Sequence, residues 1–246
     1  GMLLQSHTLD TIGVYARNLV DLAIINNCLI DQTTDAISEE ILKEGSKVFK
    51  NWAKNSETPK FAFLETPAWP EADIGAKNAI ETAITSLSSA CQRERLPDPF
   101  SKIIDYHAAV FAAENSHYYG PFLDNHSELL SEKLRDRLIV SKTTLASEYI
   151  AALNARDKIY HSLEALLDDY DAVLCLAATG AAPIGFETTG SAIFNGLWTY
   201  LGVPCLSLPL LTTEKMPLGL QLVGKRGDER KLFETANWIE NHLKAS

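Results

Sequence analysis

The sequence predicts an α/β fold in which a mixed sheet is flanked by helices, with a long helical stretch in the middle of the chain. Apolar residues recur at helical spacing through the first two thirds of the chain, whereas after Asp171 short apolar runs alternate with turn residues. The 246 residues are 46% hydrophobic and 22% charged, which is ordinary for a globular protein. We therefore expect a single domain over residues 1–246.

Two amphipathic helices are expected first, over Arg17–Ile30 and Asp35–Lys54, because apolar residues lie three and four positions apart. A short aromatic and apolar run after a proline predicts a strand over Lys60–Glu65. Asp73 is suited to cap a further helix, which the spacing extends from Ile74 to Arg95.

The segment Leu96–Pro99 must end that helix, since two closely spaced prolines remove backbone donors. The spacing then predicts an almost wholly helical stretch over Ser101–Leu167, with interruptions at Gly120-Pro121 and near residues 124–127. The last helix of this stretch is expected over Ala146–Leu167.

Three apolar runs near the C-terminus predict strands, at residues 172–178, 203–211 and 217–224. Asp228 is suited to cap a closing helix. The apolar face of that helix consists of Leu232, Phe233, Ala236, Ile239 and Leu243.

The charge balance argues against nucleic-acid and membrane partners. With 22 basic and 32 acidic residues, the formal charge of −10 would repel phosphates and anionic headgroups. No apolar run has the length of a membrane span, and the N-terminus lacks the pattern of a signal peptide. We expect a soluble, cytoplasmic protein.

No cofactor and no metal are expected. The six histidines form no HExxH motif, the four cysteines form no CxxC pair, and neither GxGxxG nor a P-loop occurs. Cys175 and Cys205 lie inside apolar runs and are interpreted as reduced core residues.

Three segments, in this order, resemble the amidase-signature family of hydrolases. They are TLDTIGVYARNLVDL at Thr8–Leu22, IFNGLWTYLGVPCLSLP at 193–209, and PLGLQLVGKRGDERKLFETA at Pro217–Ala236. The resemblance covers essentially the whole chain and is looser between Thr33 and Ser141. It implies the family's sheet and pocket in partial form.

The resemblance also implies hydrolysis or transfer at a carboxamide by a serine nucleophile, a second serine on a cis peptide bond, and a lysine base. In the family these groups lie N-terminal to the segment that TLDTIG matches. We therefore expect no catalytic residue in this chain, which corresponds to the family's C-terminal part, and no activity from it alone. Gly1 before Met2 resembles the scar of a removed tag, and the reading frame is expected to be incomplete upstream.

Substitute catalytic groups are not evident elsewhere. The serine cluster Ser86–Ser89 has no adjacent glycine and is interpreted as a helix surface. Glu114 and His117 lie on one predicted helix, where a solvated surface is favoured over a catalytic pair. The acidic run Asp168-Asp169-Asp171 is interpreted as a solvated turn.

The remaining candidate is the predicted loop from Ala177 to Trp198, which is rich in small residues. Thr179, Asn195 and Trp198 suit a pocket wall that recognises an amide, since they offer two hydrogen-bonding groups and a flat surface. The alternative, equally weighted, places Phe194 and Trp198 in the core and has Asn195 hydrogen-bonding to the backbone.

Two classes of function stay open. In the first, the chain belongs to an amide hydrolase or to one component of an amidotransferase, with a small-molecule amide or a misacylated transfer RNA as substrate. In the second, the scaffold serves as a non-catalytic binding or interaction module; a third idea is that a separate chain supplies the catalytic groups. Because unpaired sheet edges associate readily, we expect self-association or a partner that covers the exposed sheet.

Overall fold

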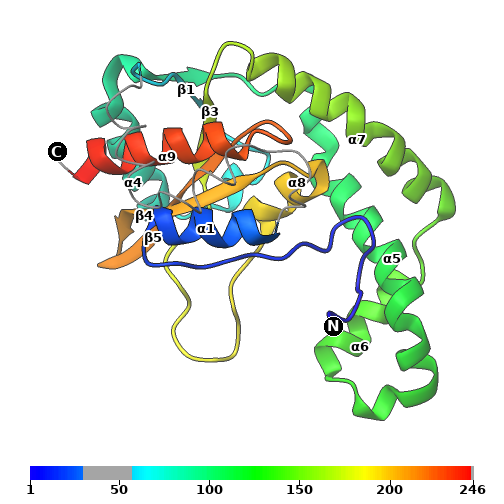
Figure 1. Cartoon of the computed structure of the whole chain (residues 1–246). Helices are drawn as coiled ribbons and strands as arrows, with labels where there is room; N and C mark the ends of the chain where they lie inside the picture. Colours follow the sequence, from blue (N-terminus) through cyan, green and yellow to red (C-terminus); the bar gives the residue numbers. More distant parts are fainter. Residues whose placement is uncertain (30–56, 245–246) are drawn as a thin grey trace.

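The computed structural model describes residues 1–29 and 57–244, and these form a mixed five-stranded sheet with helices on both sides (Figure 1). The order is β2-β1-β3-β5-β4, in which β2, β1 and β3 run parallel while β5 is antiparallel to both of its neighbours. The strands are β1 (Phe61–Leu64), β2 (Cys91–Glu94), β3 (Ala172–Leu176), β4 (Cys205–Thr213) and β5 (Met216–Val223). The predicted fold class is confirmed.

The strand register assigns the side chains to two faces, because neighbours along a strand point in opposite directions. Leu174 lies opposite Leu222 on one face, and Cys175 lies opposite Gln221 on the other. The second face is tightly packed at Gly219, where an added Cβ would lie 2.8 Å from the Cβ of Ala177, which cannot rotate away. Glycine is therefore required at that point of β5.

The first face is covered by α4 (Ile74–Leu87) and α9 (Glu229–Lys244), with α1 (Leu19–Leu29) packed on α9. Asp73 caps α4 as predicted, since its Oδ1 accepts from the amide of Ala76 at 2.6 Å. The ring of Trp238 on α9 lies 5.9 Å from that of Phe61 on β1. The closing helix of the prediction thus exists and seals this face.

The second face carries α8 (Ile193–Leu201), which packs against the long helical stretch formed by α5 (Ile103–His126), α6 (Glu132–Ser141) and α7 (Ala146–Leu166). Figure 1 shows α5 and α7 running beside each other and away from the sheet, with α6 at the far end. Short 3-10 turns occupy Trp69–Glu71, Ser88–Ala90, Asp98–Lys102 and Ser127–Leu129.

The predicted helix to Arg95 is wrong at its end, because α4 stops at Leu87 and the chain turns into β2. Ser88, at φ 51°, reverses the chain. β2 then pairs with β1, and the guanidinium of Arg93 bridges Glu65 and Glu81. Strand pairing and this ion pair outweigh the helical pattern, which had continued through the serine cluster Ser86–Ser89.

Two further expectations need correction. Gly120-Pro121 does not interrupt the helix, since α5 continues through Pro121 to His126 while it packs against α6 and α7. That packing offsets the backbone hydrogen bond that proline removes. The predicted loop from Ala177 ends at Ile193, where α8 begins, so Asn195 and Trp198 lie on a helix. The helix predicted over 35–54 falls outside the described residues.

The edge strand β4 leaves one of its faces open. Ser207 and Pro209 are exposed, and a register shift lies between Leu208 and Leu211. Proline is tolerated there because an edge strand has a free side that needs no donor.

A buried carboxylate fastens the N-terminal segment to the long helices. Glu114 on α5 accepts hydrogen bonds from the hydroxyls of Ser6 and Thr8, from the Thr8 amide at 2.8 Å, and from the Tyr149 hydroxyl at 2.9 Å. The prediction of a solvated surface is therefore wrong for Glu114, which is 6% exposed, whereas His117 is exposed. Burial raises the pKa of Glu114, but these hydrogen bonds outweigh it and hold the pKa below its ordinary value.

We expect Glu114→Gln to lower the free energy of unfolding by about 3 kcal/mol near pH 7, because an amide cannot accept all four hydrogen bonds. A carboxylate with a depressed folded-state pKa stabilises above its unfolded pKa, and that contribution disappears as pH falls through the folded pKa. The difference between the two proteins should therefore shrink in acid, as measured by urea unfolding at several pH values.

The matched control is Glu128→Gln, because Glu128 is an exposed glutamate. A loss for Glu114→Gln that equals the control, or that persists unchanged at low pH, would contradict the role assigned to the carboxylate.

Candidate functional site

The candidate site lies where β3 ends and α8 begins. The side-chain amide of Asn195 donates to the carbonyl of Ala177 at 3.2 Å, and its Oδ1 accepts from Nε2 of Gln221 on β5 at 2.8 Å. Asn195 is exposed, whereas Gln221 is 4% exposed. Two partners thus fix the orientation of the Asn195 side-chain amide. Its second N–H and the second lone pair of its oxygen stay available to a ligand.

A buried polar row supports Gln221 from behind. The thiol of Cys175 donates to Oε1 of Gln221 at 3.4 Å, and burial raises the pKa of this thiol to about 12. Cys175 is therefore a protonated donor and not a nucleophile. The indole nitrogen of Trp198 has no nitrogen or oxygen partner among the described residues, and its neighbour is the Cys175 sulfur.

The three residues predicted for the pocket wall occupy different environments. Thr179 is half-buried, and its carbonyl accepts from the amide of Asp73 at 2.8 Å. Trp198 is 1% exposed and makes an edge-on contact with Phe100, with 6.3 Å between ring centroids. Asn195 points its amide toward Ala177 and Gln221 and is the exposed member of the set. Their contact with a substrate stays a prediction.

The turn after β3 is held against the start of α4. An added Cβ on Gly180 would clash with Oδ2 of Asp73, so no larger residue fits there. Thr179 is thereby placed beside the helix that Asp73 caps.

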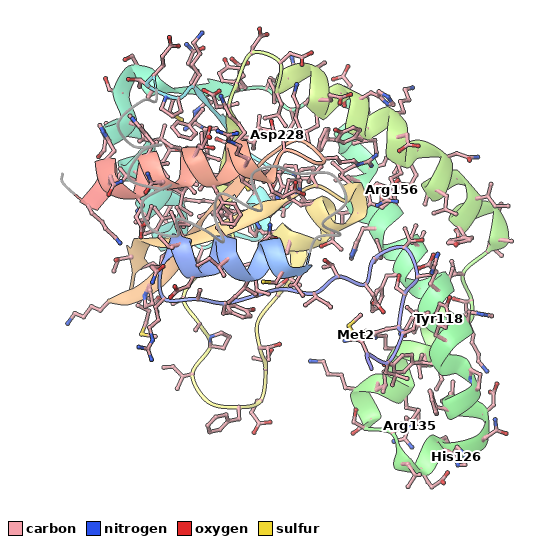
Figure 2. All side chains as sticks on the ribbon, in the orientation of Figure 1. Met2, Tyr118, His126, Arg135, Arg156 and Asp228 are labelled. Atoms are coloured by element: carbon pink, nitrogen blue, oxygen red, sulfur yellow. The ribbon has the colours of Figure 1, made fainter. Side chains whose placement is uncertain are left out.

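Two arginines hold the other end of α8. Arg156 on α7, labelled in Figure 2, donates to the carbonyl of Tyr200. Arg226 donates to the carbonyl of Leu201 through two nitrogens, at 2.8 and 2.6 Å. Cations at these carbonyls satisfy the acceptors that a helix end leaves open. Gly202 follows with φ 64°, as a left-handed cap requires.

The acidic run before β3 forms a turn, as predicted, and its members pair with lysines. Asp168 pairs with Lys225 at 2.5 Å, and Asp171 pairs with Lys231 at 2.7 Å. These pairs border a polar hollow of about 620 Å³ near the start of β3. In the part of the chain that the structure describes, no three His, Cys, Asp or Glu side chains are grouped as metal ligands, and no helix is long and apolar enough to cross a membrane.

Gln221 is the residue that the sequence interpretation missed. It is the one polar side chain in the run LGLQLV of β5, and it lies on the face that α8 covers. A polar side chain in a buried strand requires a hydrogen-bond partner. The glutamine in this apolar run could therefore have indicated a site from the sequence.

Comparison with known proteins identifies the family. The family model Amidase matches residues 1–233, so the chain belongs to the amidase family. It is 26% identical to the A subunit of glutamyl-tRNA(Gln) amidotransferase from Nitratiruptor sp., over 99% of this chain and 61% of that protein. It is 23% identical to the corresponding Thermotoga maritima protein, over 98% of this chain and 57% of that protein. The predicted resemblance is confirmed.

Solved structures agree on the fold. The match to a crystal structure of an amidase covers 76% of this chain and 46% of the amidase chain, with a TM-score of 0.68 and 22% identity. The match to the structure of 6-aminohexanoate cyclic dimer hydrolase complexed with substrate covers 93% of this chain and 54% of the hydrolase chain, with a TM-score of 0.65 and 14% identity. The chain thus spans 61% of the first relative's length and about half of these neighbours.

We expect Trp198→Ala to lower the free energy of unfolding by about 3–5 kcal/mol, because the indole on α8 is buried against Phe100 and Cys175 of β3. Trp198→Phe should cost clearly less, since most of the packed volume is retained. Thermal or urea unfolding of both variants measures this. An alanine variant as stable as the wild type would show that the indole is not a core side chain.

Proposed function

We propose that this chain provides the scaffold and one wall of the substrate pocket of an amide-hydrolysing or amide-transferring enzyme. The observation that carries the proposal is the exposed amide of Asn195, oriented by Gln221 and by the Ala177 carbonyl. Thr179 and Asn195 form the wall, while Trp198 supports it from the core. An amide group with one free donor and one free acceptor matches the acceptor and donor of a carboxamide.

Membership of the amidase family supports this assignment, as do the names of the similar proteins. The glutamyl-tRNA(Gln) amidotransferases and the amidase of known structure are named for reactions at amide groups. We propose that the enzyme to which this chain belongs also acts on a carboxamide group, and we do not choose among the substrates of the similar proteins. A cytoplasmic location and the absence of nucleic-acid contacts belong to the same proposal.

The proposal assigns no nucleophile or base to these residues. Among the described residues, no serine hydroxyl hydrogen-bonds to a lysine or a histidine, and Ser6 donates to a carboxylate instead. An unactivated hydroxyl is a weak nucleophile, and a carboxamide requires both attack and oxyanion stabilisation. The pocket wall is therefore proposed to bind an amide without cleaving it.

We expect the purified 246-residue chain to release no ammonia from benzamide above the buffer blank, with an active amidase as the positive control. Enzymatic release by the chain alone, abolished by substitution of a residue within it, would contradict the assignment of scaffold and wall.

Binding tests the wall itself. In ligand-observed NMR, Asn195→Ala should weaken benzamide binding about tenfold, because one hydrogen-bonded contact is worth about 1.4 kcal/mol. Asn241→Ala is the matched control, since Asn241 is an exposed residue of α9. Equal affinity in the two variants would remove Asn195 from the wall.

A further inference from the structure

An imidazole lies against the first turn of α8, beside the candidate site. His107 on α5 faces Gly196, the residue that directly follows Asn195. A Cβ added to Gly196 would lie 2.9 Å from Cε1, 3.1 Å from Nε2 and 3.2 Å from Nδ1 of this imidazole. The part of the ring that carries both nitrogens is therefore turned toward α8, and the absence of a side chain on the glycine gives the ring its room.

The nitrogens of His107 have no hydrogen-bond partner among the residues that the structure describes. The imidazole stacks on the ring of Phe111, with 6.3 Å between the centroids and 13° between the planes. The side chain is half-buried, so it has lost part of its water and is still within reach of a ligand. A polar group in such a place loses free energy unless a hydrogen bond replaces the water. Packing alone therefore does not explain a histidine at this position, because an apolar side chain would fill it at a lower cost.

Burial also determines which form of the imidazole borders the site. It lowers the pKa of His107, because desolvation disfavours the charged form of the ring. Near pH 7 the ring is neutral and has one N–H and one nitrogen lone pair. The free N–H of Asn195 complements a carbonyl oxygen, and the lone pair of a neutral imidazole complements an amide N–H.

We propose that His107 is a further residue of the proposed amide pocket, where its imidazole accepts a hydrogen bond from the N–H of a bound carboxamide. The carbonyl oxygen of the same ligand then accepts from the free N–H of Asn195, so the two side chains bind opposite ends of one amide group. Primary and secondary amides carry the required N–H, whereas tertiary amides do not. The inference rests on the proposed function, because it needs an amide ligand at Asn195.

Ligand-observed NMR on the whole chain tests the contact. His107→Leu should weaken benzamide binding about tenfold, because one hydrogen bond to the ligand is lost. For N,N-dimethylbenzamide, which has no N–H, the wild type and this variant should bind with equal affinity. His107→Gln should restore benzamide binding to within about threefold of the wild type, since its amide oxygen can accept in place of the ring nitrogen. His117→Leu is the matched control, because His117 is an exposed histidine of the same helix.

Urea unfolding separates this role from a structural one. The free energy of unfolding of His107→Leu should equal or exceed that of the wild type, since the ring nitrogens bond to no described residue. Unchanged benzamide affinity in His107→Leu, an equal loss for the two ligands, a glutamine variant as weak as the leucine variant, or a binding loss that accompanies a stability loss would each overturn the inference. Benzamide binding that Asn195→Ala weakens and His107→Leu does not would overturn the inference and leave the proposed function intact. A wild-type chain that binds no benzamide would instead contradict the proposed pocket wall itself.

Discussion

The docking of α8 onto the sheet is the constraint on which the rest of the structure depends. At its first turn, the amide of Asn195 is held by Gln221 and by the carbonyl of Ala177. At its last turn, Arg156 and Arg226 occupy the open carbonyls. Its inner face is fully buried, so both ends and the middle are fixed at once. The helix therefore sets the path of the loop before it and of β4 after it.

This constraint explains why the candidate site is rigid on one side and open on the other. Cys175 and Gln221 form a buried polar row whose members satisfy one another, and such a row tolerates little displacement. The exposed amide of Asn195 is the end of that row. Beyond it, the loop from Ala177 to the start of α8 carries its apolar tip into solvent, so the same helix anchors both the proposed pocket wall and the projecting loop.

The spacing of apolar residues predicted the helices and strands well where a single helical or strand pattern extended along the whole element. The strands near the C-terminus and the Asp73 cap are confirmed, because buried apolar runs and capping residues are local features. β2 and the continuous α5 were missed, since strand pairing at Cys91 and packing around Pro121 are non-local. In the site, Asn195 was a candidate because it follows a run of small residues, and its contact with a substrate stays a prediction. The burial of Trp198 and the contacts of Gln221 depend on which residues meet across the sheet.

The most direct test of this account is the coupling between Asn195 and Gln221. A double-mutant cycle of Asn195→Ala, Gln221→Ala and the pair, measured by urea unfolding, isolates their interaction from the effect of each substitution alone. The account predicts a coupling energy of about 1 kcal/mol, which corresponds to one hydrogen bond in a partly buried place. Additive effects, with a coupling below about 0.3 kcal/mol, would contradict the claim that Gln221 holds the exposed amide in position.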